Sequence, residues 1–185
     1  MESTISPKKY RAMYRLLDRV NPVPYDCGTL CGAACCSCAD LDSEEPQMGM
    51  YLYPGEEKLF TMEEDWLHWS VENVDDYDFP MSWYGDIHFV TCLNGPHCPR
   101  KQRPLQCRFF PLAPHIDQND VLHLICNDLD LPYACPLIEE KMELTPEFIK
   151  ATYTVWKHLI RDPYIYDLVV YDSSYRDEDW IEYLI

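Results

Sequence analysis

The residues whose chemistry stands out are ten cysteines, most of them gathered in two short stretches of the chain. Short spacing lets one turn of backbone present two sulfurs to one ion with little loop entropy left to lose. The spacing therefore favours metal binding through thiolates, with disulfide bonds or free thiols as the alternatives. The first stretch holds Cys27, Cys31, Cys35, Cys36 and Cys38, the second holds Cys92, Cys98 and Cys107, and Cys126 and Cys135 follow.

Two of these cysteines, Cys35 and Cys36, are adjacent in the sequence. Because neighbouring side chains diverge, we expect one of them to ligate one centre while the other serves a second centre or packs as a small apolar residue. Neither stretch has the CxxC…CxxC spacing of a zinc ribbon. The cysteines together predict a metal, and they leave its identity and the number of centres open.

Basic residues accompany the second stretch, namely Arg100, Lys101, Arg103 and Arg108. Four thiolates on one divalent ion carry a net charge of about −2, so such a site needs nearby donors or cations. We expect Arg108, which follows Cys107, to lower the pKa of that thiol and to donate to its sulfur. The alternative is that the cations pair with the acidic segment 40–86.

The cysteine pattern resembles a known family. Residues 27–36, CGTLCGAACC, resemble the CxxxCGxCC signature of the YkgJ-type cysteine-cluster proteins, which are described as zinc- or iron-chelating. Residues 103–111, RPLQCRFFP, look like the RPxxCRxFP element of that family, the most specific part of the match. The CLNGPHC of residues 92–98 and the YACP of residues 133–136 extend the resemblance, which covers residues 27–140.

The resemblance implies zinc or iron, including an iron–sulfur cluster, held by cysteine thiolates, and we assign Arg103 and Arg108 as cofactor-binding residues. The chain departs from the family by an extra residue between Cys31 and the adjacent pair and by a long aromatic insertion before Cys92. Cys38 and Cys126 lie outside the pattern. The ligands that the resemblance implies are Cys27, Cys31, Cys35, Cys36, Cys92, Cys98, Cys107 and Cys135.

Two other functions stay open. The first is a redox or methyl-transfer enzyme built on an iron–sulfur centre. The family includes flagellin lysine N-methylases, so the resemblance implies methyl transfer from S-adenosylmethionine as a possible activity. The chain has no glycine-rich loop after a strand to hold that cofactor in the usual manner. The second alternative is an interaction module, in which the acidic and aromatic segment Asp65–Phe79 captures a basic, lysine-bearing protein segment.

Histidine adds little to this set. His97 stands beside Cys98 and could replace a thiolate as a ligand, but a loop histidine that forms hydrogen bonds is the simpler interpretation. A Cys–His nucleophile at Cys98 or Cys107 is less favoured, since a catalytic thiol is usually single.

Composition limits the partners and the compartment. Lys and Arg number 15 against 32 Asp and Glu, a formal net charge of −17. Such a surface repels nucleic acids and anionic lipids, so we expect neither as a partner. Residues 1–20 lack the apolar run of an export signal, and no stretch reaches the ~20 apolar residues of a membrane span. We therefore expect a cytoplasmic protein with reduced thiols.

Helices are expected at both ends of the chain. Ser6 and Pro7 predict the start of an amphipathic helix that ends at Asn21, with its basic residues on a solvated face or over an anionic part of the fold. A second helix is expected over 145–162, with an apolar face of Ile149, Tyr153, Trp156, Leu159 and Ile160. The tail 164–185 is expected to form one or two short helices docked by Tyr166, Val169, Trp180 and Leu184.

Strands are expected between the cysteine stretches and after them. Alternating residues predict strands at 86–92 and 121–126, and aromatic residues predict a short strand at 51–53. Residues 93–114 are expected to form a loop. The acidic and aromatic stretch 65–81 is interpreted as an insertion, and the sequence does not predict where in the fold it packs.

These elements predict one small α+β domain with a core of cysteine-rich loops and short strands flanked by helices. It comprises an N-terminal amphipathic helix over 1–22, a cysteine-cluster metal-binding domain over 23–140, and a helical extension over 141–185 packed on it. A metal would join the loop at 27–36 to the loop at 92–107, so its binding free energy would become folding free energy.

Overall fold

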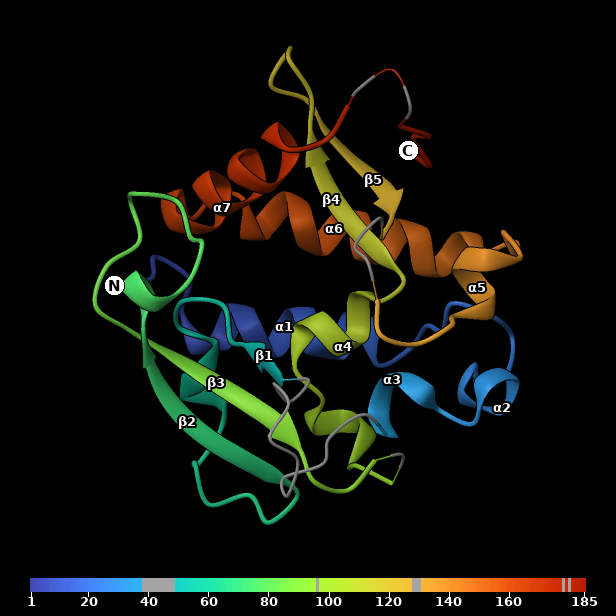
Figure 1. The fold of residues 1–185 in the computed structure, drawn as a ribbon, viewed down its shortest axis with the longest axis horizontal. Helices are drawn as coiled ribbons and strands as arrows, with labels where there is room; N and C mark the ends of the chain where they lie inside the picture. The colour runs from blue at the N-terminus through green and yellow to red at the C-terminus, as the bar shows by residue number, and fades with distance from the viewer. Residues whose placement is uncertain (38–48, 96, 128–130, 178, 180) are drawn as a thin grey trace.

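The computed structural model of the protein describes residues 1–37, 49–95, 97–127, 131–177, 179 and 181–185. Within them, helices and two small antiparallel sheets form one α+β domain, which confirms the predicted fold class (Figure 1). The helices are α1 (Pro7–Leu17), α2 (Gly28–Cys31), α3 (Ala34–Ser37), α4 (Leu105–Phe109), α5 (Pro136–Glu139), α6 (Pro146–Leu159) and α7 (Pro163–Ser174). The strands are β1 (Gly49–Tyr51), β2 (Leu67–Asn73), β3 (Asp86–Cys92), β4 (Leu112–Ile116) and β5 (Leu122–Cys126), and short 3-10 helices occur at Glu56–Leu59, Val74–Asp76 and Arg100–Gln102.

The N-terminal helix α1 begins where the sequence predicts. The hydroxyl of Ser6 accepts a hydrogen bond from the Lys9 N–H, and Pro7 occupies the first turn. The buried face consists of Tyr10, Met13, Tyr14 and Leu17. Its basic residues are exposed, in agreement with a solvated face. The helix ends at Leu17, earlier than the predicted Asn21.

The three-stranded sheet has the order β1-β3-β2, and both pairs are antiparallel. The central strand β3 has the predicted bounds and ends at Cys92, which is paired with Leu67 of β2. Strand β2 lies in the stretch that was predicted only as an insertion. Strand β1 begins at Gly49, where a Cβ would lie 2.1 Å from the Phe89 ring, so glycine allows the close pairing of β1 with β3.

The two-stranded sheet pairs β4 with β5, Leu112 standing opposite Cys126. Strand β5 agrees with the predicted 121–126, but β4 was predicted as part of a loop. Strand β4 tolerates Pro114 because β5 is its only strand partner within the described residues. On the other side of β5, the backbone N–H of Leu184 donates to the carbonyl of Leu124 at 2.8 Å.

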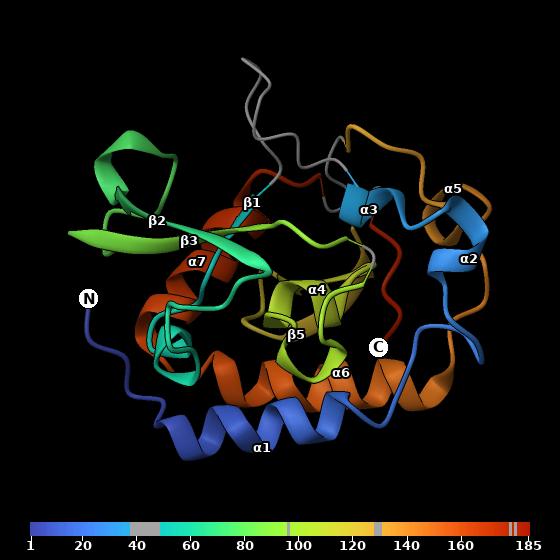
Figure 2. The same cartoon turned by 90° about the horizontal axis from the view of Figure 1, so that it is seen from below.

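The C-terminal helices α6 and α7 pack against the β4–β5 hairpin, and α1 and α6 run side by side (Figures 1 and 2). The predicted face of α6 is partly wrong: Trp156 and Leu159 are buried, but Ile149, Tyr153 and Ile160 only flank the core. The rest of the buried face is Phe148, Ala151, Thr152 and Val155. These positions lie on the neighbouring side of the helix because α6 packs against both α1 and the β4–β5 hairpin.

In the described part of the tail there is one α-helix, α7, which agrees with the predicted one or two. The carboxylate of Asp162 caps it by accepting the backbone N–H of Tyr164 at 3.1 Å, and it also accepts the N–H of Thr4 at 2.7 Å. Of the predicted docking residues, Val169 is buried and Tyr166 is half-buried. The prediction for Leu184 is wrong, since that side chain is exposed and the backbone makes the contact; Trp180 lies outside the described residues.

Candidate functional site

A cavity of about 730 Å³ lies where α3, the end of β3 and α4 meet. Figures 1 and 2 show α4 between the three-stranded sheet and the end of the molecule formed by α2, α3 and α5. Most of the predicted metal ligands line this cavity, namely Cys27, Cys35, Cys36, Cys92, Cys98 and Cys107. The two cysteine stretches therefore meet in space around one cavity.

Four of these thiols form what we call the α4 thiol group: Cys36, Cys92, Cys98 and Cys107. They come from α3, from the end of β3, from the loop that follows β3, and from α4. Burial raises the pKa of the Cys107 thiol to about 12, and the charges of the other three thiolates raise it as well. The mutual repulsion shows that the four sulfurs share one electrostatic environment.

A close backbone approach holds two of these segments together. Gly95, in the loop after β3, lies against the backbone of Cys36, and a Cβ at this position would stand 2.0 Å from the Cys36 carbonyl oxygen. Only glycine fits that distance without displacing the backbone. Gly95 therefore permits the contact between the first and second cysteine stretches.

The arginine at the thiols is Arg103. Its Nε donates to the Cys98 Sγ at 3.0 Å. Its charge adds to the lowering of the pKa of Cys36 by the Cys35 hydrogen bond, and it opposes the rise that burial causes in the pKa values of Cys92 and Cys107. Arg103 itself lines the cavity. A guanidinium in this position supplies the donor that a cluster of thiolates needs.

The adjacent cysteines behave differently from the expectation. The Sγ atoms of Cys35 and Cys36 lie 3.8 Å apart, so the two side chains do not diverge. The hydrogen bond between them lowers the pKa of Cys36 and raises that of Cys35. Their position in the single turn α3 brings the sulfurs together, and they form one paired unit on the cavity wall.

A second set of thiols lies next to the first. Beyond the effect of burial, the charges of Cys135 and Cys31 raise the pKa of Cys27, and the charge of Cys31 also raises that of Cys135. Cys27 and Cys35 connect the two sets, because the charge of Cys27 raises the pKa of Cys35. The eight predicted ligands thus fall into the α4 thiol group, the Cys27–Cys31–Cys135 set, and Cys35 between them.

The described cysteines are all free thiols, and Cys38 lies outside the described residues. Among the residues that the structure describes, no three His, Cys, Asp or Glu side chains are arranged closely enough to hold one metal ion. The thiols are neighbours, but they do not yet point at a common centre. Cys107, for example, directs its Sγ to the Sδ of Met50 at 3.4 Å.

The predicted role of Arg108 at Cys107 is wrong. Consecutive residues on a helix point about 100° apart, and Arg108 extends from α4 toward α1 instead of toward the cavity thiol. Its Nη1 pairs with the Asp18 carboxylate at 2.5 Å, and its guanidinium lies 4.2 Å from the centre of the Tyr14 ring. This pairing also differs from the alternative, since Asp18 is not part of the acidic segment 40–86.

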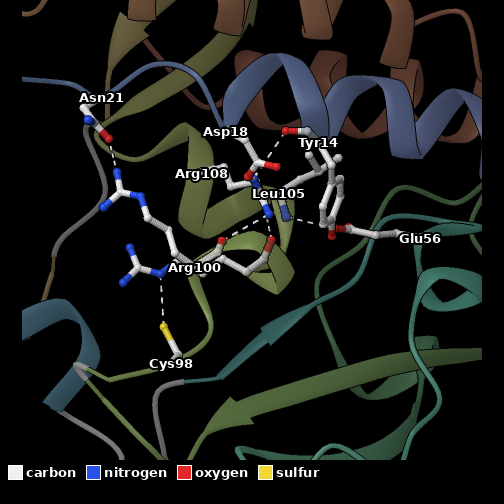
Figure 3. A network of polar contacts seen from close by, with 9 residues as sticks. Tyr14, Asp18, Asn21, Glu56, Cys98, Arg100, Leu105 and Arg108 are labelled. Carbon is white, nitrogen blue, oxygen red and sulfur yellow. Dashed lines mark hydrogen bonds and ion pairs between the residues drawn. The ribbon is translucent and has the colours of Figure 1, made fainter.

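A buried carboxylate fixes the start of α4. Glu56 has no solvent exposure, and its Oε1 accepts the Tyr14 hydroxyl at 2.5 Å and the Leu105 N–H at 2.8 Å (Figure 3). Its Oε2 accepts the Tyr53 N–H at 3.1 Å. Burial raises the pKa of Glu56, while these hydrogen bonds and the charge of Arg108 oppose the shift. Glu56 and Arg108 therefore position α4, which carries Cys107.

Other predicted residues do not join this site. His97 is exposed and does not line the cavity. In the segment Asp65–Phe79, Trp66 is buried, Phe79 is half-buried against Trp83, and Tyr77 is exposed. Sequence reasoning missed Glu56, which was only one of the acidic residues of segment 40–86.

Within the described residues no helix has both the length and the apolar character needed to cross a membrane. Comparisons of the chain with protein-family models, with curated proteins and with solved structures give no match. The resemblance of the cysteine pattern to the YkgJ-type family therefore stays a prediction.

Proposed function

We propose that this protein binds zinc or iron through cysteine thiolates, with the α4 thiol group as its principal site. The observation that carries the proposal is the convergence of four thiols from three segments of the chain on one cavity wall, with Arg103 donating to one of them. Thiolate sulfur is the ligand that zinc and iron–sulfur clusters take from proteins. A guanidinium offsets the negative charge of such a site.

The thiols of the α4 thiol group have to turn to close around an ion, because no three of the described ligand side chains are arranged to hold one metal. Four sulfurs around a zinc ion at about 2.3 Å stand roughly 3.8 Å from one another in a tetrahedron. The Sγ atoms of Cys35 and Cys36 have a separation of 3.8 Å, but Cys35 lies outside the α4 thiol group. Closing that group requires Cys107 to leave its contact with Met50.

A bound metal would at least cross-link separate segments of the chain. It would join α3, the end of β3 and α4, which in the described residues meet mainly through Gly95 and side chains around a cavity. An iron–sulfur cluster would add electron transfer. The methyltransferase and the capture of a basic protein segment stay predictions, because no contact within the described residues favours either.

The test is metal analysis of protein purified without air. We expect at least one zinc or iron per chain, with visible absorption if the metal forms an iron–sulfur cluster, and chelation should reduce the circular dichroism signal because metal binding contributes to folding. The variant Cys107→Ser should lose metal from the α4 thiol group. Cys126→Ser is the matched control, since Cys126 does not line the cavity, and it should retain the metal.

Protein that contains less than a tenth of an equivalent of any metal, and whose circular dichroism is unchanged by chelator, would contradict the proposal. Equal metal loss in Cys107→Ser and Cys126→Ser would show that the metal is not bound by the α4 thiol group.

A further inference from the structure

A second, smaller cavity adjoins the one that the thiols line. It has a volume of about 60 Å³, and its walls come from the end of α1, the loop before α2 and the stretch 100–110. Cys27, Cys107 and Phe110 line both cavities, as does one arginine, so the two cavities are neighbours. We call the smaller one the arginine cavity, because three arginines line it: Arg100, Arg103 and Arg108.

The charge inside the arginine cavity is the reverse of the charge of the chain. Its lining holds three guanidinium groups against two carboxylates, Asp18 and Asp26, whereas the whole chain carries −17. The Asp18 carboxylate pairs with Arg108 at 2.5 Å, and the Asp26 carboxylate accepts a backbone N–H of its own loop at 3.1 Å. Among the described residues, no carboxylate lies within ion-pair distance of Arg100 or Arg103. The cavity therefore has an excess of positive charge.

Arg108 holds the backbone of the other two arginines in place. Its Nε donates to the carbonyl of Arg103 at 2.6 Å, and its Nη2 donates to the carbonyl of Arg100 at 3.2 Å. Its side chain is only 5% exposed, and its donors are used within the fold. The backbone that carries Arg100 and Arg103 is thus fixed before any ligand arrives, which lowers the ordering cost of binding.

Arg100 and Arg103 keep donors that the fold does not use. The Nε of Arg103 donates to the Cys98 Sγ at 3.0 Å, and the Nη2 of Arg100 donates to the Asn21 side chain (Figure 3). A guanidinium has more N–H groups than one such contact occupies, and within the described residues the others have no partner. Arg100 is exposed and Arg103 is half-buried, so a ligand from solvent can reach these donors.

The volume of the cavity and the shape of the guanidinium group limit the ligand. A water-sized group needs roughly 10–15 Å³, so this cavity takes about four to six non-hydrogen atoms. The planar fork of N–H donors matches the oxygens of a carboxylate or a phosphate. We propose that the arginine cavity binds a small oxyanion, a carboxylate or a phosphate group, with Arg100 and Arg103 as the donors. The acidic surface still repels polyanions, so the ligand is a small ion.

The probes are inorganic phosphate and acetate, each titrated into the full chain in a calorimeter. Sodium chloride keeps the ionic strength constant, because screening alone changes the interactions of exposed charges. We expect saturable binding of at least one of the two anions at one site per chain. Binding of phosphate alone would identify a phosphate site, and binding of acetate alone a carboxylate site.

A matched pair of variants separates the site from the general charge. Arg100→Gln should weaken anion binding roughly tenfold to a hundredfold, the value of one charge-assisted hydrogen bond. Lys101→Gln removes the same charge from the next residue, which is exposed and lines neither cavity, so it should bind as the unmodified chain does. Arg103→Gln should weaken binding as Arg100→Gln does. If Arg103→Gln fails to fold, the exposed Arg100 decides the question.

The absence of saturable binding with both anions would overturn the proposal. So would equal weakening in Arg100→Gln and Lys101→Gln, which would mark a diffuse attraction instead of a site.

Metal analysis accompanies each titration, so that this proposal and the proposed metal site fail separately. Arg100→Gln should keep the metal content of the unmodified chain, because Arg100 does not line the thiol cavity. A chain purified without metal should still bind the anion. Anion binding that follows the metal content and is unchanged in Arg100→Gln would assign the anion to the metal and contradict the proposal.

Discussion

Two arginines that lie close in the sequence have different tasks. Arg103 donates to the Cys98 sulfur and lines the cavity. Arg108 instead pairs with Asp18 at the end of α1 and so connects α4 to that helix. The sequence RPLQCRF led us to assign both arginines to the cofactor, with Arg108 at the Cys107 thiol because it directly follows Cys107. Helical geometry explains the difference, since a residue and its neighbour on a helix face different sides.

The contact of Gly95 with Cys36 is the residue-scale feature most open to test. In Gly95→Ala the new Cβ would stand 2.0 Å from the Cys36 carbonyl oxygen, so the loop after β3 must move away from α3. We expect a loss of about 1–3 kcal/mol of stability and a lower metal content, because the two cysteine stretches separate. Chemical denaturation and metal analysis measure the two effects.

Gly85→Ala is the control for this substitution. Gly85 has a φ of +74° and open space around its Cβ position, so alanine strains the backbone there without touching the thiols. It should reduce stability and leave the metal content unchanged. A Gly95→Ala protein with full metal content would show that the contact with Cys36 is not needed at the site.

At the scale of elements, the short helix α4 depends on the buried carboxylate of Glu56. Three groups donate to it, the hydroxyl of Tyr14 and the N–H groups of Leu105 and Tyr53. An element of five residues has too few internal hydrogen bonds to be stable alone. Glu56 therefore links α1, the 3-10 helix at Glu56–Leu59 and α4 into one support for Cys107.

This arrangement predicts a pH dependence. The pKa of Glu56 is raised in the folded protein above its ordinary value of 4.5, so the folded state holds the proton more tightly than the unfolded state. The Glu56 contribution to stability is therefore fully present below pH 4.5 and is lost as the pH rises through the folded-state pKa. Unfolding midpoints measured across this range should show that decline.

The variant Glu56→Gln should abolish this contribution to the pH dependence. It should also destabilise the protein by about 1–3 kcal/mol, because the amide NH2 group cannot accept the Tyr53 N–H. Glu57→Gln, one residue away and only half-buried, is the control and should keep the pH dependence of the unmodified chain. The same pH profile in Glu56→Gln would exclude Glu56 as its source.

Local signals predicted some elements well and others poorly. Ser6 with Pro7 marks α1, and alternation marks β3 and β5, since caps and side-chain periodicity act within a few residues. The strands β2 and β4 were missed because their own sequences carry no clear local strand signal, and their stability comes from pairing with β3 and β5.

The sequence predicted which residues form the candidate site, but it did not predict which of these residues lie next to one another. Cysteine spacing identified the thiols, and six of the eight proposed ligands line one cavity. The sequence could not show that Cys35 and Cys36 form a pair, or that Cys135 belongs to the hydrophobic cluster against which Cys27 packs. Those relations depend on how separate loops pack, and no short motif encodes that packing.

At the scale of the whole molecule, one cavity joins the two cysteine stretches. Six of the predicted thiol ligands and the guanidinium of Arg103 line its wall. The net charge of −17 disfavours anionic partners in general, so a cation such as a metal ion is the kind of ligand that the charge of the chain favours.

The measurement that tests the central claim most directly is X-ray absorption at the metal edge of the anaerobically purified chain. The account predicts a first shell made of sulfur, at about 2.3 Å if the metal is zinc. It also predicts that Cys107→Ser reduces the sulfur number in that shell. A first shell of oxygen or nitrogen, or a sulfur number that Cys107→Ser leaves unchanged, would contradict binding by the α4 thiol group.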